Sequence, residues 1–116
     1  PVSIATMPIP HEIDYCKKGG NFGPHNLWEN RPGAFQSSRY IFATMHNAGV
    51  RVYDIANPFQ PQEAAHFVPP PPGKMYDPRP NRPQVIQSAD CFVDAEGVMY
   101  LTDSNAGLNI LQFEGA

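Results

Sequence analysis

His25 is the residue with the clearest chemical potential in this sequence. It lies in the stretch FGPHNLWENRPG (22–33), between two groups of turn-forming residues. A neutral imidazole is the commonest side-chain ligand for transition metals. Asp90 begins the stretch DCFVD (90–94) and is predicted to occupy the position of His25 in a second, similar segment. We therefore predict that both residues face a ligand and that His25 is the candidate metal ligand. The alternative is that His25 bonds neighbouring backbone and fixes the start of a strand.

Three further residues are candidates for ligand contact. Trp28 and Arg31 belong to the same stretch as His25, and His46 immediately precedes a turn. A side chain in that turn faces either solvent or a ligand at the rim of a site. Glu29 and Arg51 are additional charged candidates for such a rim. The predicted ligand-facing set is thus His25, Trp28, Arg31, His46 and Asp90.

The other ionisable residues are weaker candidates for a site. His66 lies in the middle of a predicted outer strand and is assigned a structural role. His11 and Cys16 could bind a metal together, but their spacing matches no standard metal site. Aspartate at a strand end caps a turn by accepting backbone N–H groups. Three aspartates are expected to do so: Asp54, Asp94 and Asp103.

Charge and motif content weigh against several function classes. The formal net charge is −3 and no stripe of Lys or Arg occurs, which disfavours nucleic acid and anionic membranes as partners. No apolar run has the length that spans a bilayer. The sequence also lacks a Gly-x-Ser-x-Gly motif, a Cys-His signature and a Gly-rich phosphate loop. Cys16 and Cys91 permit either one disulfide or two free thiols, so the cellular compartment is not predicted.

The elements that must position these residues are short strands. No window of a dozen residues keeps a helical apolar period without a Pro or Gly interrupting it. Turn-forming groups such as Asn47-Ala48-Gly49 separate the apolar runs. The sequence therefore predicts an all-β chain. The expected strands are 2–6, 25–29, 40–45, 50–55, 64–68, 89–94, 98–103 and 108–113.

An internal repeat organises these strands. IFATMHNAGVRVYDI (41–55) matches MYLTDSNAGLNILQF (99–113) at a constant offset of 58 residues, and Asn-Ala-Gly recurs at 47–49 and 105–107. The first copy carries an insertion around residues 34–39. Four short antiparallel strands per unit are typical of a β-propeller blade, and apolar residues on both faces of 108–113 fit a stacked blade. A small β-sandwich with a duplicated hairpin is the alternative.

The repeat divides the chain into four parts. Residues 24–68 form a complete blade, and residues 87–116 form a last blade that lacks its fourth strand. The N-terminal segment (1–23) contributes an outer strand of a preceding blade. Residues 69–86 form a proline-rich arm with seven prolines between 69 and 83. Such a segment is stiff and extended, and it is predicted either to lie over the propeller or to bind an SH3-type partner.

The stretch VYDIANPFQP (52–61) resembles the LVIVD repeat, in which a strand ending in aspartate precedes a small residue, Asn/Asp-Pro, a variable pair and Pro. The resemblance covers about 100 of the 116 residues. These residues are similar to the C-terminal portion of such propellers. It departs from the pattern after Phe113, where no Asn-Pro corner follows. The more distantly similar selenium-binding-protein propellers imply metal-dependent chemistry at the central channel, and hence a transition metal as a cofactor.

About two blades do not close a ring, because propellers need roughly four to eight. We therefore expect a companion polypeptide to carry the remaining blades, with self-assembly of this chain as the alternative. The predicted function is a propeller channel that binds a small-molecule ligand or a metal and supports metal-dependent catalysis. The competing prediction is a non-catalytic interaction scaffold whose partner contacts the proline-rich arm.

Overall fold

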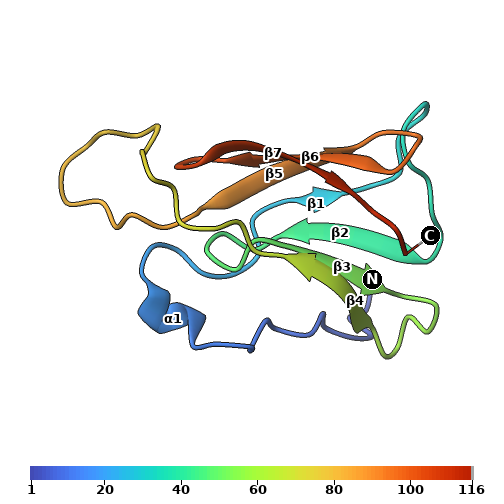
Figure 1. The fold of residues 1–116 in the computed structure, drawn as a ribbon. Helices are drawn as coiled ribbons and strands as arrows, with labels where there is room; N and C mark the ends of the chain where they lie inside the picture. Colours follow the sequence, from blue (N-terminus) through green and yellow to red (C-terminus); the bar gives the residue numbers. More distant parts are fainter. Residues whose placement is uncertain (116) are drawn as a thin grey trace.

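The fold consists almost entirely of short antiparallel strands (Figure 1). The structure is a computed structural model that describes residues 1–115. Its elements in chain order are α1 (Tyr15–Lys18), β1 (Leu27–Trp28), β2 (Tyr40–Thr44), β3 (Val50–Asp54), β4 (Gln62–Phe67), β5 (Ser88–Val93), β6 (Val98–Asp103) and β7 (Gly107–Gln112). The first sheet has the order β1-β2-β3-β4 and the second the order β5-β6-β7. The predicted all-β class is confirmed, and both sheets are blade-like meanders.

Most predicted strands lie within two residues of their expected bounds. β1 is shorter than expected, with two residues in place of 25–29, and β4 begins at Gln62 rather than Ala64. The strand expected at 2–6 is wrong, since residues 1–14 contain no strand. Pro8 and Pro10, just beyond it, remove backbone donors that a sheet ladder would need. The four-residue helix α1 was not predicted, because one turn is too short to show an apolar period.

The strand registers define the internal repeat in space. Trp28 lies opposite Phe42, and Phe42 lies opposite Val52 across the first sheet. In the second sheet Phe92 lies opposite Tyr100, and Tyr100 lies opposite Ile110. The two sets are equivalent under the 58-residue offset once the six-residue insertion is allowed for. We call each set the aromatic row of its sheet: Trp28, Phe42 and Val52 in the first, and Phe92, Tyr100 and Ile110 in the second.

The core lies between the two sheets, which stack face to face (Figure 1). The aromatic row of the first sheet is buried there, with exposed fractions of 6%, 1% and 5% for Trp28, Phe42 and Val52. It packs against the inner face of the second sheet. The residues that form this inner face are Cys91, Val93, Met99 and Leu101.

The outer face of the first sheet is covered by the N-terminal segment, which runs along it in Figure 1. Tyr15 of α1 packs with Ala43, Met45 and Tyr53 of the sheet and its β2–β3 turn. The Tyr53 hydroxyl donates to the backbone oxygen of Pro8 at 2.9 Å. The N-terminal segment therefore occupies the face on which a preceding blade was expected to stack.

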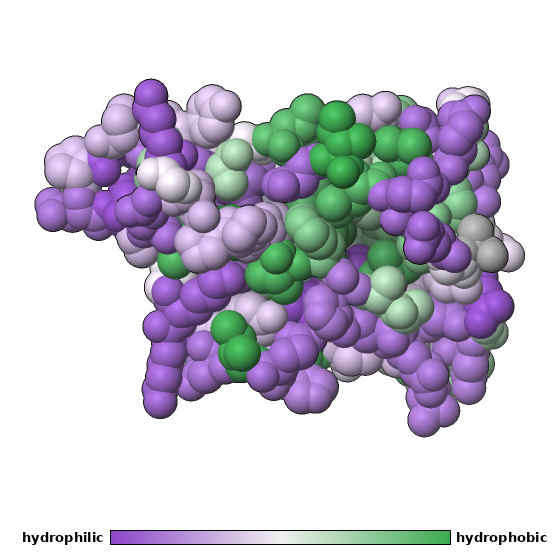
Figure 2. Space-filling view, in the orientation of Figure 1, coloured by the Kyte–Doolittle hydropathy of each residue, from purple (hydrophilic) through white to green (hydrophobic). Residues whose placement is uncertain are grey.

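The outer face of the second sheet is uncovered. Its aromatic row has exposed fractions of 45% at Phe92, 36% at Tyr100 and 63% at Ile110, and Leu108 is also exposed. Figure 2 shows apolar surface over the part of the molecule where Figure 1 places β5–β7. Within the described residues β7 pairs only with β6, so its other edge is free. This sheet is the three-stranded unit that the sequence predicted.

The recurring Asn-Ala-Gly turns have one structural role in both copies. The Asn47 amide donates to the backbone oxygens of Tyr15 and Gly19 at 2.8 and 2.9 Å. The Asn105 amide donates to the backbone oxygen of Val85 at 2.8 Å. Each asparagine thus holds the segment that leads into its own sheet, which explains its recurrence.

The predicted aspartate caps are confirmed. Asp54 accepts the backbone N–H of Ala56, and Asp94 accepts those of Glu96 and Val98. Asp103 accepts the N–H groups of the residues that follow it in its turn, and its other oxygen accepts the N–H of Gln87. Cys16 and Cys91 are both free thiols. In residues 1–115 no helix has the length and apolar character needed to cross a membrane.

Candidate functional site

Strands β1 and β5 lie beside each other, and the predicted site residues fall into two groups around them. The backbone N–H of His25 donates to Thr44 at 2.9 Å, which holds it at the start of β1. Its ring Nδ1 lies 2.7 Å from the backbone oxygen of Ala89 at the start of β5. A carbonyl oxygen only accepts, so Nδ1 donates this hydrogen bond, and Nε2 makes no hydrogen bond within residues 1–115. The alternative that His25 bonds backbone is thus confirmed, and the ring still offers one free nitrogen.

The second copy does not place Asp90 at the position of His25. Leu27 lies opposite Ala43, whereas Cys91 lies opposite Leu101, and Ala43 and Leu101 are 58 residues apart. Asp90 therefore corresponds to Asn26, and His25 corresponds to Ala89. The predicted correspondence was wrong by one residue, because the insertion in the first copy left the alignment of the inner strands free to slide.

His25 and His46 form a pair of rings. Their centroids are 4.8 Å apart and the rings meet edge to face. Burial lowers the pKa of His46, and the charge of His25 lowers it further. His46 has a positive φ of 51°, which turns the chain into the Asn-Ala-Gly turn. The lowered pKa favours the neutral imidazole of His46 at neutral pH.

The transition metal that the resemblance implies does not fit these residues alone. Two imidazoles provide at most two ligands, whereas protein metal sites generally use three or four side chains. Within residues 1–115, no third ligating side chain lies close enough to complete a group around His25. A metal at this position would need ligands from other blades, so we derive no chemistry through it here.

The other three predicted residues line one open hollow of about 270 Å³ beside β1 and β5. Trp28, Arg31 and Asp90 contribute to its wall, together with Phe92 and Tyr100 of the second aromatic row. The Trp28 and Phe92 rings meet edge to face at 4.9 Å, and this contact joins the two inner strands. The remaining lining residues are Leu27, Cys91 and Thr102. The hollow therefore combines aromatic walls with one cationic and one anionic side chain.

Two polar groups of this hollow lack partners within the described part of the chain. The indole Nε1 of Trp28 is buried and donates to no acceptor. Leaving such a donor unpaired costs about 1–3 kcal/mol. The Arg31 guanidinium lies 5.0 Å from the Trp28 ring centroid and makes no ion pair. An acceptor in the hollow could reach the exposed Arg31 guanidinium, whereas the indole N–H is closed off from the hollow.

Arg51 is not the rim charge that the sequence suggested, because it is fully buried beneath the N-terminal segment. Its guanidinium pairs with Glu12 of that segment and with Glu63 of β4, the latter at 3.1 Å. It also donates to the Tyr15 hydroxyl at 2.9 Å. The hydrogen bond from Arg51 lowers the pKa of Glu12 to about 2. This network fastens the N-terminal segment to the first sheet.

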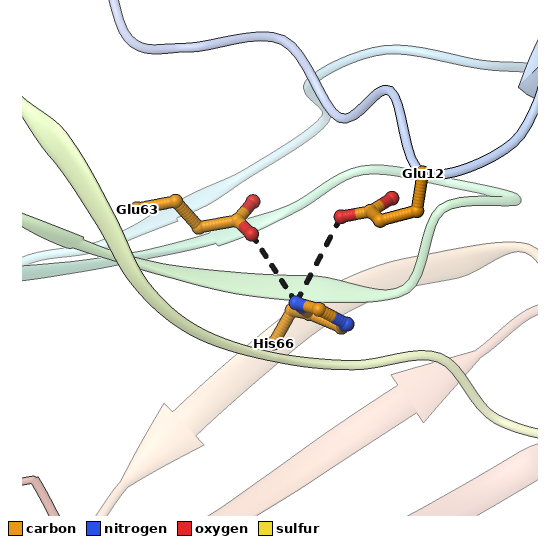
Figure 3. A group of neighbouring side chains, drawn as sticks. All are labelled: Glu12, Glu63 and His66. Atoms are coloured by element: carbon orange, nitrogen blue, oxygen red, sulfur yellow. Dashed lines mark hydrogen bonds and ion pairs between the residues drawn. The ribbon is translucent and has the colours of Figure 1, made fainter.

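His66 joins the same network. Figure 3 shows Glu12 and Glu63 both directed toward His66, whose Nδ1 lies 3.2 Å from the Glu63 carboxylate and 3.8 Å from that of Glu12. These three side chains have the spacing of a metal-ligand group. However, the permanent charge of Arg51 already sits between the two carboxylates. The structural role predicted for His66 fits this arrangement, whereas sequence reasoning missed Glu12 because nothing local links it to β3.

Comparisons with known proteins add no assignment. A scan against protein-family models and searches of curated proteins and of solved structures found no significant match to this chain.

Proposed function

We propose that this chain is the C-terminal part of a β-propeller of the LVIVD type, which a companion polypeptide completes and whose central channel binds a small ligand. One observation carries the proposal. The aromatic row of the first sheet is buried against the second sheet, whereas the equivalent row of the second sheet is exposed and no further sheet of residues 1–115 packs on it. A row of this kind is built to pack on a further sheet.

The companion polypeptide is expected to supply that further sheet. An exposed apolar face next to the free edge of β7 invites aggregation unless another polypeptide covers both. A second copy of this chain is less suitable, because its own first sheet is covered by the N-terminal segment. The fourth strand that the second sheet lacks would come from the same companion.

The ligand part of the proposal rests on the inner strands. In a propeller these strands line the central channel, and here β1 and β5 hold all five predicted ligand-facing residues or lie next to them. We propose that the channel ligand contacts the hollow that Trp28, Arg31 and Asp90 line. A metal held by His25 together with side chains from the companion belongs to the same proposal.

Native mass spectrometry of the chain isolated from its natural source tests the assembly. We expect a stoichiometric complex with a second polypeptide, which Tyr100→Lys abolishes and the matched surface variant Phe59→Lys retains. Phe59 is also exposed but lies in the loop after β3. A homo-oligomer or a monomer without any second polypeptide would contradict the proposal.

Elemental analysis of the same complex tests the metal. We expect a bound transition metal that is lost in His25→Ala and kept in His66→Ala, because His66 belongs to the Arg51 network. Unchanged metal content and activity in His25→Ala would remove His25 from the site.

A further inference from the structure

A second hollow, of about 240 Å³, lies between β4 of the first sheet and β7 of the second, and we call it the β4–β7 hollow. Within residues 1–115, β4 is the strand of the first sheet that has no equivalent in the second sheet. Five of its six residues are exposed, and Phe67, which lines the hollow, is 36% exposed. The other lining residues are Ala65, His66, Met99, Leu111, Gln112 and Phe113. The β4–β7 hollow therefore lies where a fourth strand of the second sheet would run.

The free edge of β7 presents backbone groups that such a strand would bond. The N–H of Phe113 donates to the backbone oxygen of Gly97 at 3.0 Å, on the side of β6. In an antiparallel strand the backbone groups of alternate residues point to opposite sides. Those of Leu108, Ile110 and Gln112 therefore point away from β6, to an edge with which no strand of residues 1–115 pairs. An added strand would bond these N–H and C=O groups.

The strand β4 shows the register that the added strand would take. Ala65 of β4 lies opposite Val52 of β3, and the equivalent of Val52, 58 residues later, is Ile110 of β7. Cross-strand partners share one face of a sheet. The residue of the added strand opposite Ile110 therefore faces outward, beside the exposed aromatic row of the second sheet. An apolar residue at this position would extend that row by one strand.

The other face of the added strand has different surroundings from those of β4. Glu63 of β4 lies opposite Tyr53, whose equivalent in β7 is Leu111. The acid at this position of β4 has a cation beside it, since the Arg51 guanidinium lies 3.1 Å from the Glu63 carboxylate. The equivalent of Arg51 in β7 is the neutral Asn109, and Leu111 lines the mainly apolar β4–β7 hollow. A carboxylate opposite Leu111 would be unpaired, whereas an apolar side chain would fill the hollow.

We propose that the companion polypeptide binds this chain by adding an antiparallel strand to the free edge of β7, with apolar residues on both faces of that strand. One face extends the aromatic row, and the other places an aliphatic or aromatic side chain opposite Leu111 in the β4–β7 hollow. The inference rests on the proposed function and deepens it, since it names the contact that holds the companion and the side-chain pattern of its strand. The strand β4 of a second copy does not fit, because it would bring Glu63 into the hollow.

Proline at the edge of β7 tests the added strand. Gln112→Pro removes an N–H that points to the free edge and leaves the pairing with β6 in place. Gln112→Ala is the matched control, because both variants lose the side-chain amide that donates to the Glu96 oxygen. Each variant is titrated against the companion purified from the native complex and read by native mass spectrometry. We expect Gln112→Pro to weaken binding about tenfold or more and Gln112→Ala to bind nearly like the parent.

A bulky side chain on β4 tests the filling of the β4–β7 hollow. Ala65 and Ala64 are both exposed, but only Ala65 lines the hollow. Ala65→Trp should occupy the space that the added strand needs and weaken binding of the companion about tenfold or more. Ala64→Trp should bind like the parent. Circular dichroism checks that each variant retains the fold.

Hydrogen exchange of the unmodified chain gives a readout that depends on no variant. Amides that enter a sheet ladder exchange more slowly than amides at a solvated edge. We expect the amides of Leu108 and Ile110 to exchange at least about tenfold more slowly in the complex with the companion than in the isolated chain. Unchanged exchange at both residues would overturn the added strand.

The outcomes distinguish this inference from the proposed function. If Gln112→Pro and Gln112→Ala bind the companion equally while Tyr100→Lys still abolishes the complex, the companion covers the outer face without adding a strand, and only this inference fails. If no companion is found, the proposed function fails and this inference fails with it. A homodimer that Gln112→Pro dissociates would show that a second copy occupies the edge of β7, which would overturn the companion as its occupant.

Discussion

The two aromatic rows occupy the same position of the repeat but have opposite surroundings. In the first sheet Phe42 is 1% exposed, because the inner face of the second sheet lies on it. In the second sheet Tyr100, 58 residues later, is 36% exposed. Both residues make the same cross-strand pairs with their neighbours. The repeat therefore specifies the same apolar face in both sheets, but residues 1–115 bury only one of the two faces.

The opposite face of the first sheet supports this interpretation. Here the N-terminal segment supplies the cover, and it is held by the ion pair between Glu12 and the buried Arg51. Irregular chain thus covers the outer face of the first sheet, whereas nothing in residues 1–115 covers the outer face of the second sheet. The outer face of the first sheet is therefore covered, and the outer face of the second sheet is exposed.

Truncation of the two equivalent aromatic residues should give the largest difference. Phe42→Ala leaves a cavity in the core and should cost about 3–5 kcal/mol of unfolding free energy. Tyr100→Ala removes a partly exposed ring and should cost about 1 kcal/mol or less. Urea unfolding at pH 7 measures both. Equal losses would show that the outer face of the second sheet is already buried within the chain.

Alanine at the two equivalent turn glycines sharpens the comparison. Gly49 and Gly107 have φ values of 77° and 90°, so alanine is strained at either position. A Cβ at Gly49 would also lie 2.1 Å from the backbone oxygen of Phe67, whereas at Gly107 it meets only the side chain of Tyr76 at 2.8 Å. Backbone of β4 cannot move aside, but the exposed Tyr76 can.

We therefore expect Gly49→Ala to cost about 3 kcal/mol and Gly107→Ala about 1 kcal/mol. Urea midpoints at pH 7 check both values. A larger loss at Gly107 would mean that the proline-rich arm packs on the second sheet more firmly than the exposure of Tyr76 indicates.

The smallest expected effect concerns the pH dependence of stability that arises from the ion pair between Glu12 and Arg51. The folded-state pKa of Glu12 is lowered from 4.5 to about 2, mainly by the hydrogen bond from Arg51. The stabilisation is therefore fully present above pH 4.5 and is lost as the pH falls toward 2. Glu12→Gln should lower the Tm at pH 7 modestly and flatten its fall between pH 4.5 and 2.

Thermal unfolding between pH 7 and 2 measures this effect. Glu29→Gln is the matched control, because Glu29 is exposed and makes no ion pair within residues 1–115. The anchoring role of Glu12 would be refuted if both variants followed the parent protein through the acid range.

The sequence predicted most residues of the site, but it did not predict that they fall into two separate groups. Trp28, Arg31 and Asp90 were selected as ligand-facing, and they do line one hollow. That His25 and His46 form a separate ring pair depends on the pairing of the start of β1 with the end of β2, which no local pattern records. The unpaired indole N–H of Trp28 is likewise identified only from the positions of all the acceptors around it in the folded chain.

The sequence by itself determined the strands, the turns and the repeat. These depend on alternating apolar residues, on glycines that accept positive φ and on aspartates that cap the next few N–H groups, and all of these act over a few residues. Only the tertiary structure decided that Arg51 is buried under Glu12, that Asp90 is one residue out of step with His25, and which aromatic row is covered. Such features arise where distant segments meet, and irregular segments carry no periodicity that would predict the meeting.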